Sequence, residues 1–217
     1  MKIQIGIATF NSRFRSSCLL STIRSLSNQD LPDGWEVKIA VYDNEVSDDL
    51  GALGKFKFVV DSDYYLTCDD DIIYAKDYVR KMVEAAQKYT VVSLHGRPLL
   101  RAGDYFCGQH TIKFHHQLTQ IQELRVPGTG VMAVKSSFID WPVDSWIAEN
   151  LEHKRRADLL FGLKMMERRQ LATCITRQKM WCVPQRVLGE TCHRTGLSDS
   201  TTHNELAKII LEGWNNK

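Results

Sequence analysis

The chain has 217 residues, of which 43% are hydrophobic, and this is enough to bury a full core in one large domain. Its 28 basic and 26 acidic residues give a formal net charge of +2, so the composition does not favour nucleic acid as a partner. No stretch has the roughly 18 consecutive apolar residues of a membrane helix, and the first residues are too polar for the core of a signal peptide. We therefore expect neither a membrane span nor a signal peptide.

The cysteines are scattered along the chain, without a CxxC pair and without the spacing of a disulfide framework. They are Cys18, Cys68, Cys107, Cys174, Cys182 and Cys192. This usage predicts reduced thiols that mostly fill the core, and it favours a cytoplasmic location. Peripheral contact with a bilayer stays open, because a lipid-linked substrate would bring the protein to a membrane without any span.

Strand-like and helix-like apolar periods alternate in the first half of the chain. The expected strands are 2–9, 35–43, 64–68 and 90–96, and the expected helices are 13–29 and 76–89. A strand, a helix and a second strand of these lengths form a unit whose strands run parallel. The pattern predicts an α/β fold with a Rossmann-like, mostly parallel central sheet flanked by helices.

The second half of the chain is less regular. Longer loops and a small antiparallel element are expected between Gly96 and Gly130. A strand at 131–135 and helices at 155–170 and 204–214 follow. No linker rich in proline, glycine or serine divides the sequence, so we expect one domain over residues 1–217.

Three consecutive aspartates, Asp69, Asp70 and Asp71, follow the apolar run YYLTC. Adjacent carboxylates raise one another's pKa unless a positive charge lies among them. Ligands of open α/β sheets bind at the carboxyl ends of the strands, where the loops 8–13, 42–49 and 68–74 are expected to meet. A Mn²⁺ or Mg²⁺ ion between these carboxylates and phosphate groups would neutralise the cluster, since both ions prefer oxygen ligands. The alternative is a solvated acidic turn.

Five sequence pieces, in order between residues 3 and 170, resemble those of a known family. They are I-x-I-A-T-F-N, V-Y-D-N-x-x-S-D, D-D-D-I-I-Y-x-x-D-Y, G-T-G and A-D-L-L-F-G-L. The arrangement resembles GT-A-fold glycosyltransferases, most of all the family 2 enzymes of bacterial surface polysaccharide synthesis and their relatives in large DNA viruses. A bare D-x-D occurs by chance in many proteins, so the resemblance depends on all five pieces in order.

The resemblance implies a role for each matching position. It implies a nucleotide site formed by Ala8, Thr9, Phe10, Arg13, Asp43, Asn44, Asp69 and Asp70. It implies metal ligation by Asp71, Asp69 and His193, and a general base at Asp158. The donor or acceptor sugar would contact His95, Arg97, Gly128, Thr129, Gly130 and Trp141. Residues 1–96 would then form the nucleotide-binding half, and residues 97–217 the acceptor-binding and catalytic half.

The implied reaction is the transfer of a sugar from a nucleoside diphosphate donor to a glycan or lipid-linked acceptor. UDP is the favoured carrier, because Asp43 matches the carboxylate that accepts the uracil imide N–H in this family. Mn²⁺ or Mg²⁺ would be the cofactor. A single carboxylate base at Asp158 would give inversion at the anomeric carbon.

Read alone, several of these residues have a simpler interpretation. Phe10 and Trp141 suit a core, Asp43 with Asn44 suits a turn closed by side-chain hydrogen bonds, and Asp158 suits a helix N-cap, which would leave retention of configuration open. Two other functions also stay open. A sugar nucleotidyltransferase would share the sheet and the carboxylates, although the first loop ATFNSRFR lacks the glycine-rich pattern expected there. A non-catalytic module that binds nucleotide sugars would need no base.

Overall fold

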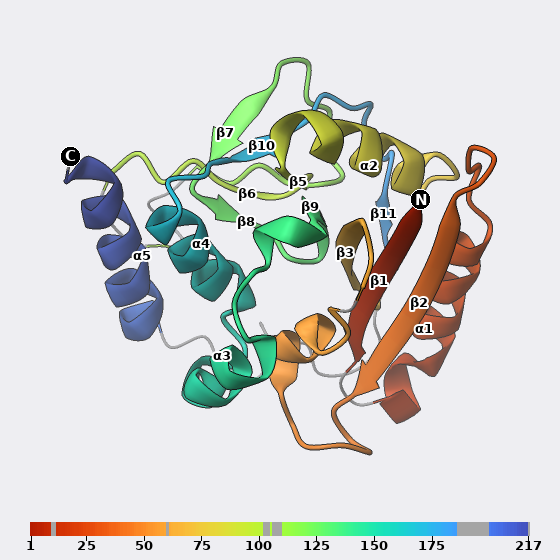
Figure 1. Ribbon diagram of the computed structural model, residues 1–217, viewed down its shortest axis with the longest axis horizontal. Coiled ribbons are helices and arrows are strands. Elements are labelled where there is room, and N and C mark those ends of the chain that lie inside the picture. The colour runs from red at the N-terminus through yellow and green to blue at the C-terminus, as the bar shows by residue number, and fades with distance from the viewer. Residues whose placement is uncertain (10–11, 60, 102–104, 106–109, 186–199, 217) are drawn as a thin grey trace.

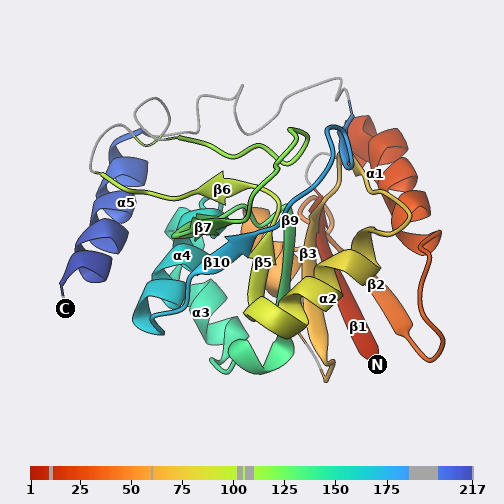
Figure 2. The same ribbon diagram turned by 90° about the horizontal axis from the view of Figure 1, so that it is seen from above.

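A computed structural model describes residues 1–9, 12–59, 61–101, 105, 110–185 and 200–216, without the side chains of residues 12–15. Its centre is a seven-stranded sheet in the order β2-β1-β3-β9-β5-β10-β7 (Figure 2). The strands are β1 (Lys2–Thr9), β2 (Glu36–Asp43), β3 (Tyr64–Asp69), β5 (Val91–Ser93), β7 (Gln122–Leu124), β9 (Val131–Lys135) and β10 (Ala172–Cys174). All run in one direction except β9 and β7, which are antiparallel to their neighbours.

The described helices cover the sheet and extend it at one end. They are α1 (Ser12–Ser27), α2 (Tyr78–Tyr89), α3 (Val143–Glu149), α4 (Ala157–Glu167) and α5 (Ser200–Asn215), with 3₁₀ turns η1 (Gly51–Phe56), η2 (Ser136–Phe138) and η3 (Leu151–His153). Two small antiparallel pairs lie apart from the main sheet. They join β4 (Ile72–Ile73) to β11 (Val183–Pro184) and β6 (Gly96–Arg97) to β8 (Val126–Pro127).

Alternate residues of the central strands point to opposite faces of the sheet, as the pleat requires. Leu66 and Ala133 join a buried cluster with α1 and α2, whereas Tyr65 and Met132 join a second cluster with α3 and α4. A third cluster packs α5 against α4. Figure 1 accordingly shows α1 beside β1 and β2 at one end of the molecule, and α5 beside α4 at the other. The expected α/β fold with a doubly covered sheet is confirmed.

The sequence located most elements within a few residues but did not give the direction of β9. Its apolar run is compatible with either direction, and the structure pairs it antiparallel with both β3 and β5. The segment Val143–Glu149, for which the sequence indicated no regular element, is a short helix whose Trp146 and Ile147 are buried in the second cluster.

Two further expectations are met within the described part of the chain. Cys18, Cys68, Cys174 and Cys182 are free thiols and buried. Among the described helices, none combines the length and apolar character needed to cross a membrane.

Candidate active site

The carboxyl ends of three parallel strands meet at one edge of the sheet. In the register of β1 with its neighbours, Thr9 lies opposite Asp43, and Ala8 lies opposite Asp69. Because β9 is antiparallel to β3, it begins where β3 ends, and the Asp69 N–H donates to the Gly130 carbonyl at 3.0 Å. This edge therefore brings together residues that are far apart in the sequence.

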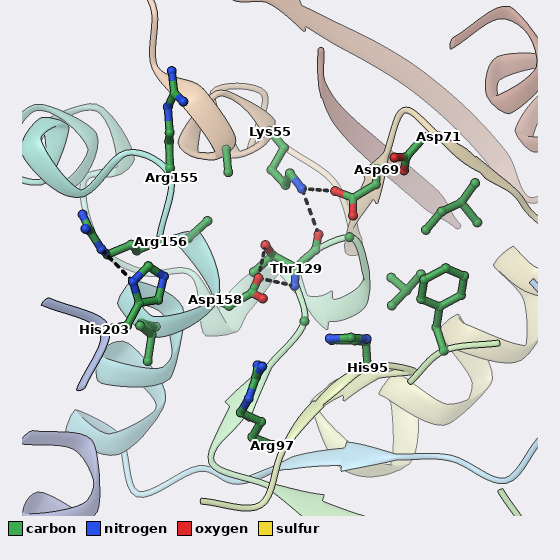
Figure 3. A pocket seen from close by; sticks show the side chains of 18 of the residues that line it. Lys55, Asp69, Asp71, His95, Arg97, Thr129, Arg155, Arg156, Asp158 and His203 are labelled. Atoms are coloured by element: carbon green, nitrogen blue, oxygen red, sulfur yellow. Dashed lines mark hydrogen bonds and ion pairs between the residues drawn. The ribbon is translucent and has the colours of Figure 1, made fainter. Parts of the chain in front are cut away.

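A cavity of about 380 Å³ opens at this edge (Figure 3). Eight of the predicted site residues line it: Asp69, Asp71, His95, Arg97, Gly128, Thr129, Gly130 and Asp158. Other charged or aromatic lining residues are Lys55, Tyr105, Phe114, Arg155, Arg156 and His203. The cavity thus combines carboxylates with several cationic side chains.

The side chains of Asp69, at the end of β3, and of Asp70 and Asp71, which follow it, point in different directions. Asp69 Oδ1 accepts from Lys55 Nζ at 2.6 Å, and Asp70 Oδ2 accepts from Thr9 Oγ1 at 2.6 Å, whereas Asp71 lines the cavity. Asp70 is only 3% exposed. The repulsion between adjacent carboxylates is reduced by this divergence and by the buried ammonium group of Lys55.

Lys55 comes from η1, which packs on the face of the sheet that α3 and α4 cover. Its side chain is only 4% exposed. Burial alone would favour the neutral amine, but the carboxylate of Asp69 prevails and raises the pKa of Lys55 above its ordinary value. The ammonium group is also 3.5 Å from the Thr129 carbonyl oxygen. Lys55 therefore links the end of β3 to the loop before β9 and stays charged.

Glycine is required where the loop before β9 passes β3. A Cβ atom on Gly130 would lie 1.9 Å from Asp69 Oδ2, and one on Gly128 would lie 2.7 Å from the His95 side chain. The Tyr74 hydroxyl fixes the same contact, because it donates to the Gly130 carbonyl at 2.7 Å. The G-T-G piece thus allows close packing of Asp69 and His95 around Thr129.

Asp158 is the second residue of α4, whose N-cap is Arg156, so Asp158 is not the cap that the sequence allowed as an alternative. Its Oδ1 accepts two hydrogen bonds from Thr129, one from the backbone N–H at 2.7 Å and one from Oγ1 at 2.6 Å. No described residue donates to Oδ2. The carboxylate is therefore fixed in orientation, with one oxygen left for a ligand.

His95 follows β5, which runs in the same direction as β3, so it reaches the same edge of the sheet. Burial lowers the pKa of His95 below its ordinary value, although the nearby charge of Asp158 acts in the opposite direction. The imidazole is consequently neutral at pH 7. The Phe114 ring lies against it, with ring centroids 6.3 Å apart.

Several predicted nucleotide-site residues lie at this sheet edge but do not line the cavity. They are Ala8, Thr9, Asp43, Asn44 and Asp70. Asp43 Oδ1 accepts from the Glu45 N–H at 2.9 Å, which is the turn that the sequence allowed as an alternative. Their contacts with a nucleotide stay predictions.

Two of the predicted residues make side-chain contacts elsewhere in the fold. The Asn44 side chain donates to the carbonyls of Thr9 and Gly51 and accepts from the Leu50 N–H, so it shapes its own loop. Trp141 does not line the cavity. Its ring is partly buried against the second cluster, 6.0 Å from Trp146 and 6.1 Å from Phe161 between ring centroids. The predicted contact of Trp141 with a sugar stays a prediction.

Three predicted side chains lie outside the described residues. These are Phe10, Arg13 and His193. Their predicted contacts with the base, the phosphates and the metal stay predictions.

The basic residues of the cavity were not predicted from the sequence. Lys55 stands in the short, otherwise apolar run GALGKF, where a single lysine is a weak signal. Arg155 and Arg156 directly precede α4, and a basic pair at that position is unusual, since the helix dipole favours acidic residues there. Nothing in the sequence near His203 indicated its position, which results from the packing of α5 on α4.

The residues of the cavity fit a hard divalent cation. Asp69 and Asp71 line the same space, and Mg²⁺ in nucleotide sites is commonly held by one or two carboxylates together with phosphate oxygens. Within the described part of the chain, no three side chains form a complete metal site. Phosphate oxygens of a bound nucleotide would therefore have to complete the coordination.

Comparison with solved structures identifies the fold. The crystal structure of S. aureus TarS residues 1–349 in complex with UDP-GlcNAc matches 100% of this chain and 67% of that chain, with a TM-score of 0.57 at 12% identity. The chain has the GT-A glycosyltransferase fold. The same TarS fragment in complex with UDP matches 100% of this chain and 71% of that chain, with a TM-score of 0.55 at 10% identity.

At these identities the similarity establishes the GT-A fold alone. No protein-family model and no curated protein sequence matches the chain. The function must therefore be inferred from the geometry of the cavity.

Proposed function

We propose that this chain is a metal-dependent glycosyltransferase. It would move a sugar from a nucleoside diphosphate donor, with UDP as the favoured carrier, to a hydroxyl group of a glycan or lipid-linked acceptor. The observation that carries the proposal is the geometry of Asp158, whose Oδ1 is held by two donors of Thr129 while Oδ2 accepts from no described residue. The GT-A fold, with solved TarS complexes of UDP and UDP-GlcNAc, supports a nucleotide-sugar donor.

In this proposal Asp158 is the general base. An acceptor hydroxyl attacks the anomeric carbon, its proton passes to Asp158 Oδ2, and the bond between that carbon and the diphosphate oxygen breaks. The electron pair of that bond leaves with the nucleoside diphosphate. A positioned base of this kind typically contributes about 10² to 10⁴ in rate. One such step inverts the configuration of the sugar.

Asp69, Asp71 and Lys55 form the donor end of the cavity. Asp71 and Asp69 would hold Mn²⁺ or Mg²⁺, which when bound would offset the charge that develops on the leaving diphosphate. Lys55 holds the Asp69 carboxylate in place through their 2.6 Å ion pair. The chain's own contribution at this end is therefore to hold two carboxylates in fixed positions.

The test is release of UDP from a panel of UDP-sugars in the presence of Mn²⁺, with the wild-type chain and Asp158→Ala. We expect metal-dependent release by the wild type and a loss of about 10² to 10⁴ in rate for the variant. Asp61→Ala is a matched control, because the Asp61 side chain is 99% exposed and lies outside the cavity.

Other outcomes would contradict the proposal in distinct ways. Pyrophosphate formation from a nucleoside triphosphate and a sugar phosphate would indicate a nucleotidyltransferase. Binding of UDP-sugar without turnover would indicate a non-catalytic module. Full activity of Asp158→Ala would show that another group is the base.

A further inference from the structure

One end of the cavity, beyond Asp158, is formed by arginine and histidine side chains from three separate segments. This basic end consists of Arg97 on β6, Arg156 before α4, and His203 on α5 (Figure 3). Arg156 Nε donates to His203 Nδ1 at 3.3 Å, which joins the start of α4 to α5 and leaves the positive charge on the two arginines. A cation at a helix N-terminus opposes the helix dipole, whereas an anion bound there would be favoured by both the dipole and Arg156.

Arg97 is the member of the basic end with the clearest need for a ligand. Its Nη1 donates to the Tyr105 hydroxyl at 3.0 Å, and its guanidinium carbon lies 4.0 Å from the centre of the same ring. Nε is buried and has no hydrogen-bond partner. No carboxylate of a described residue pairs with Arg97. A guanidinium group held in this way has unused donors in a geometry that suits an oxyanion.

The basic end lies on the opposite side of Asp158 from the donor end. Figure 3 shows Asp158 and Thr129 between Lys55 with Asp69 on one side and Arg156 with His203 on the other. The Tyr105 ring, whose hydroxyl accepts from Arg97, lies 5.5 Å from the His203 ring between centroids, so Arg97 belongs to the same end of the cavity. A base must face the acceptor on the side away from the leaving group, and this is the side where Arg97 lies.

We propose that the basic end binds an oxyanion carried by the acceptor, a phosphate or carboxylate group close to the hydroxyl that reacts. This inference rests on the proposed function, because it takes the diphosphate of the donor to occupy the opposite end. Arg97 is then a specificity-determining residue, and Arg156 assists it. The acceptor is then anionic near its reacting hydroxyl group rather than a neutral sugar.

The first test measures anion binding without turnover. Inorganic phosphate is titrated into the full chain saturated with UDP and Mn²⁺, and binding is followed by calorimetry for the wild type and Arg97→Gln. We expect phosphate to bind the wild-type complex and to bind the variant about ten- to a hundredfold more weakly, the usual effect of losing a charge-assisted hydrogen bond. Arg80→Gln, at a half-buried arginine on α2, removes the same charge outside the cavity and should leave binding unchanged.

Two results of this titration would overturn the inference. Equal affinity of the wild type and Arg97→Gln would show that Arg97 holds no anion. Phosphate binding that UDP abolishes would show that the arginines serve the donor diphosphate instead. If Arg97→Gln fails to fold by circular dichroism, Arg97→Lys and Arg156→Gln are measured in its place, and unchanged binding by both would have the same meaning.

The second test distinguishes the possible sources of the oxyanion. Glycerol, glycerol 3-phosphate and glycerate are compared as acceptors that accelerate UDP release from the best UDP-sugar. We expect at least a tenfold higher kcat/KM for one of the two acidic acceptors than for glycerol, and the better one identifies phosphate or carboxylate. Equal use of all three would overturn the inference while leaving the proposed function intact. Absence of metal-dependent UDP release from every donor would instead contradict the proposed function.

Discussion

The two ends of the cavity are built in different ways. The donor end takes both of its carboxylates, Asp69 and Asp71, from the last residue of β3 and the turn that follows it. The basic end takes Arg97, Arg156 and His203 from β6, the start of α4 and α5. The first arrangement is visible as an acidic motif, whereas the second exists only in the folded chain.

This difference shows which part of the proposed site is local in the sequence. The groups proposed to hold a diphosphate lie at the end of one strand, because the parallel register fixes that end relative to its neighbours. The groups proposed to face the acceptor come from elements whose contacts are set by helix packing. Asp158 connects the two ends. Its carboxylate accepts from Thr129, and its backbone lies in the first turn of α4, whose N-cap is Arg156.

Among the changes that separate the two ends, removing the proposed metal ligand Asp71 should have the largest effect and should disable the donor end. We expect Asp71→Asn to reduce Mn²⁺-dependent UDP release about a hundredfold, because a bound cation stabilises the leaving diphosphate by several kcal/mol. Chelation by EDTA should abolish the wild-type activity, and added Mn²⁺ should restore it. Activity that survives both treatments would contradict a metal-dependent donor end.

Removing the buried lysine tests whether the donor end needs its internal cation for stability. Lys55→Met leaves Asp69 without its partner and should lower the free energy of unfolding by about 2 kcal/mol. The loss is smaller than that expected on breaking a fully buried ion pair, because the Asp69 side chain is partly exposed to solvent. Urea denaturation measures the change. Lys57→Met is the matched control, because this exposed lysine pairs with exposed Asp144 at 2.6 Å and should change stability by less than about 0.5 kcal/mol.

The pH dependence of the Lys55 contribution has a defined sign. Because the pKa of Lys55 is raised in the folded chain, its stabilisation is fully present below the unfolded pKa of about 10.4 and is lost as the pH rises through the folded pKa. A difference between wild type and Lys55→Met that grew above pH 10.4 would contradict this assignment.

Removing the side-chain hydrogen bond that orients Asp158, the proposed base, should have the smallest effect. It tests the connection between the two ends. Thr129→Val removes the 2.6 Å hydrogen bond to Asp158 but keeps the backbone donor and the side-chain size. We expect about a tenfold lower kcat with unchanged UDP binding, since one hydrogen bond to a charged group is lost. Thr129→Ser keeps the hydroxyl and should retain most of the activity. Equal losses in both variants would indicate that Thr129 contacts the sugar rather than orients Asp158.

The motifs were recognisable because each follows a strand whose period is clear. Residues 2–9 and 64–69 are strands in the structure, and Asp69 leaves the second of them as expected. The position of Gly128–Gly130 was recognisable only through the family resemblance. In a fully parallel sheet the segment before β9 would lie at the opposite edge, and only antiparallel pairing with β3 brings Gly130 against Asp69.

Trp141 shows the limit of arguments from residue type. A tryptophan near the catalytic segment suits either a sugar platform or a core, and the apolar content of its neighbours did not decide between them. The rings of Trp146 and Phe161 complete a buried cluster that Trp141 joins. A small α3 helix, which the sequence pattern did not indicate, makes this packing possible.

The sequence by itself determined the alternation of strands and helices and the acidic segment at a strand end, because apolar periods and turn residues act over a few neighbouring positions. Only the tertiary structure decided that Lys55 neutralises Asp69, that Thr129 orients Asp158, and that arginines from distant segments form the far end of the cavity. These contacts depend on strand direction and on the packing of η1, α4 and α5 against the sheet. Such packing is set by the shapes of whole faces, which no short stretch of sequence contains.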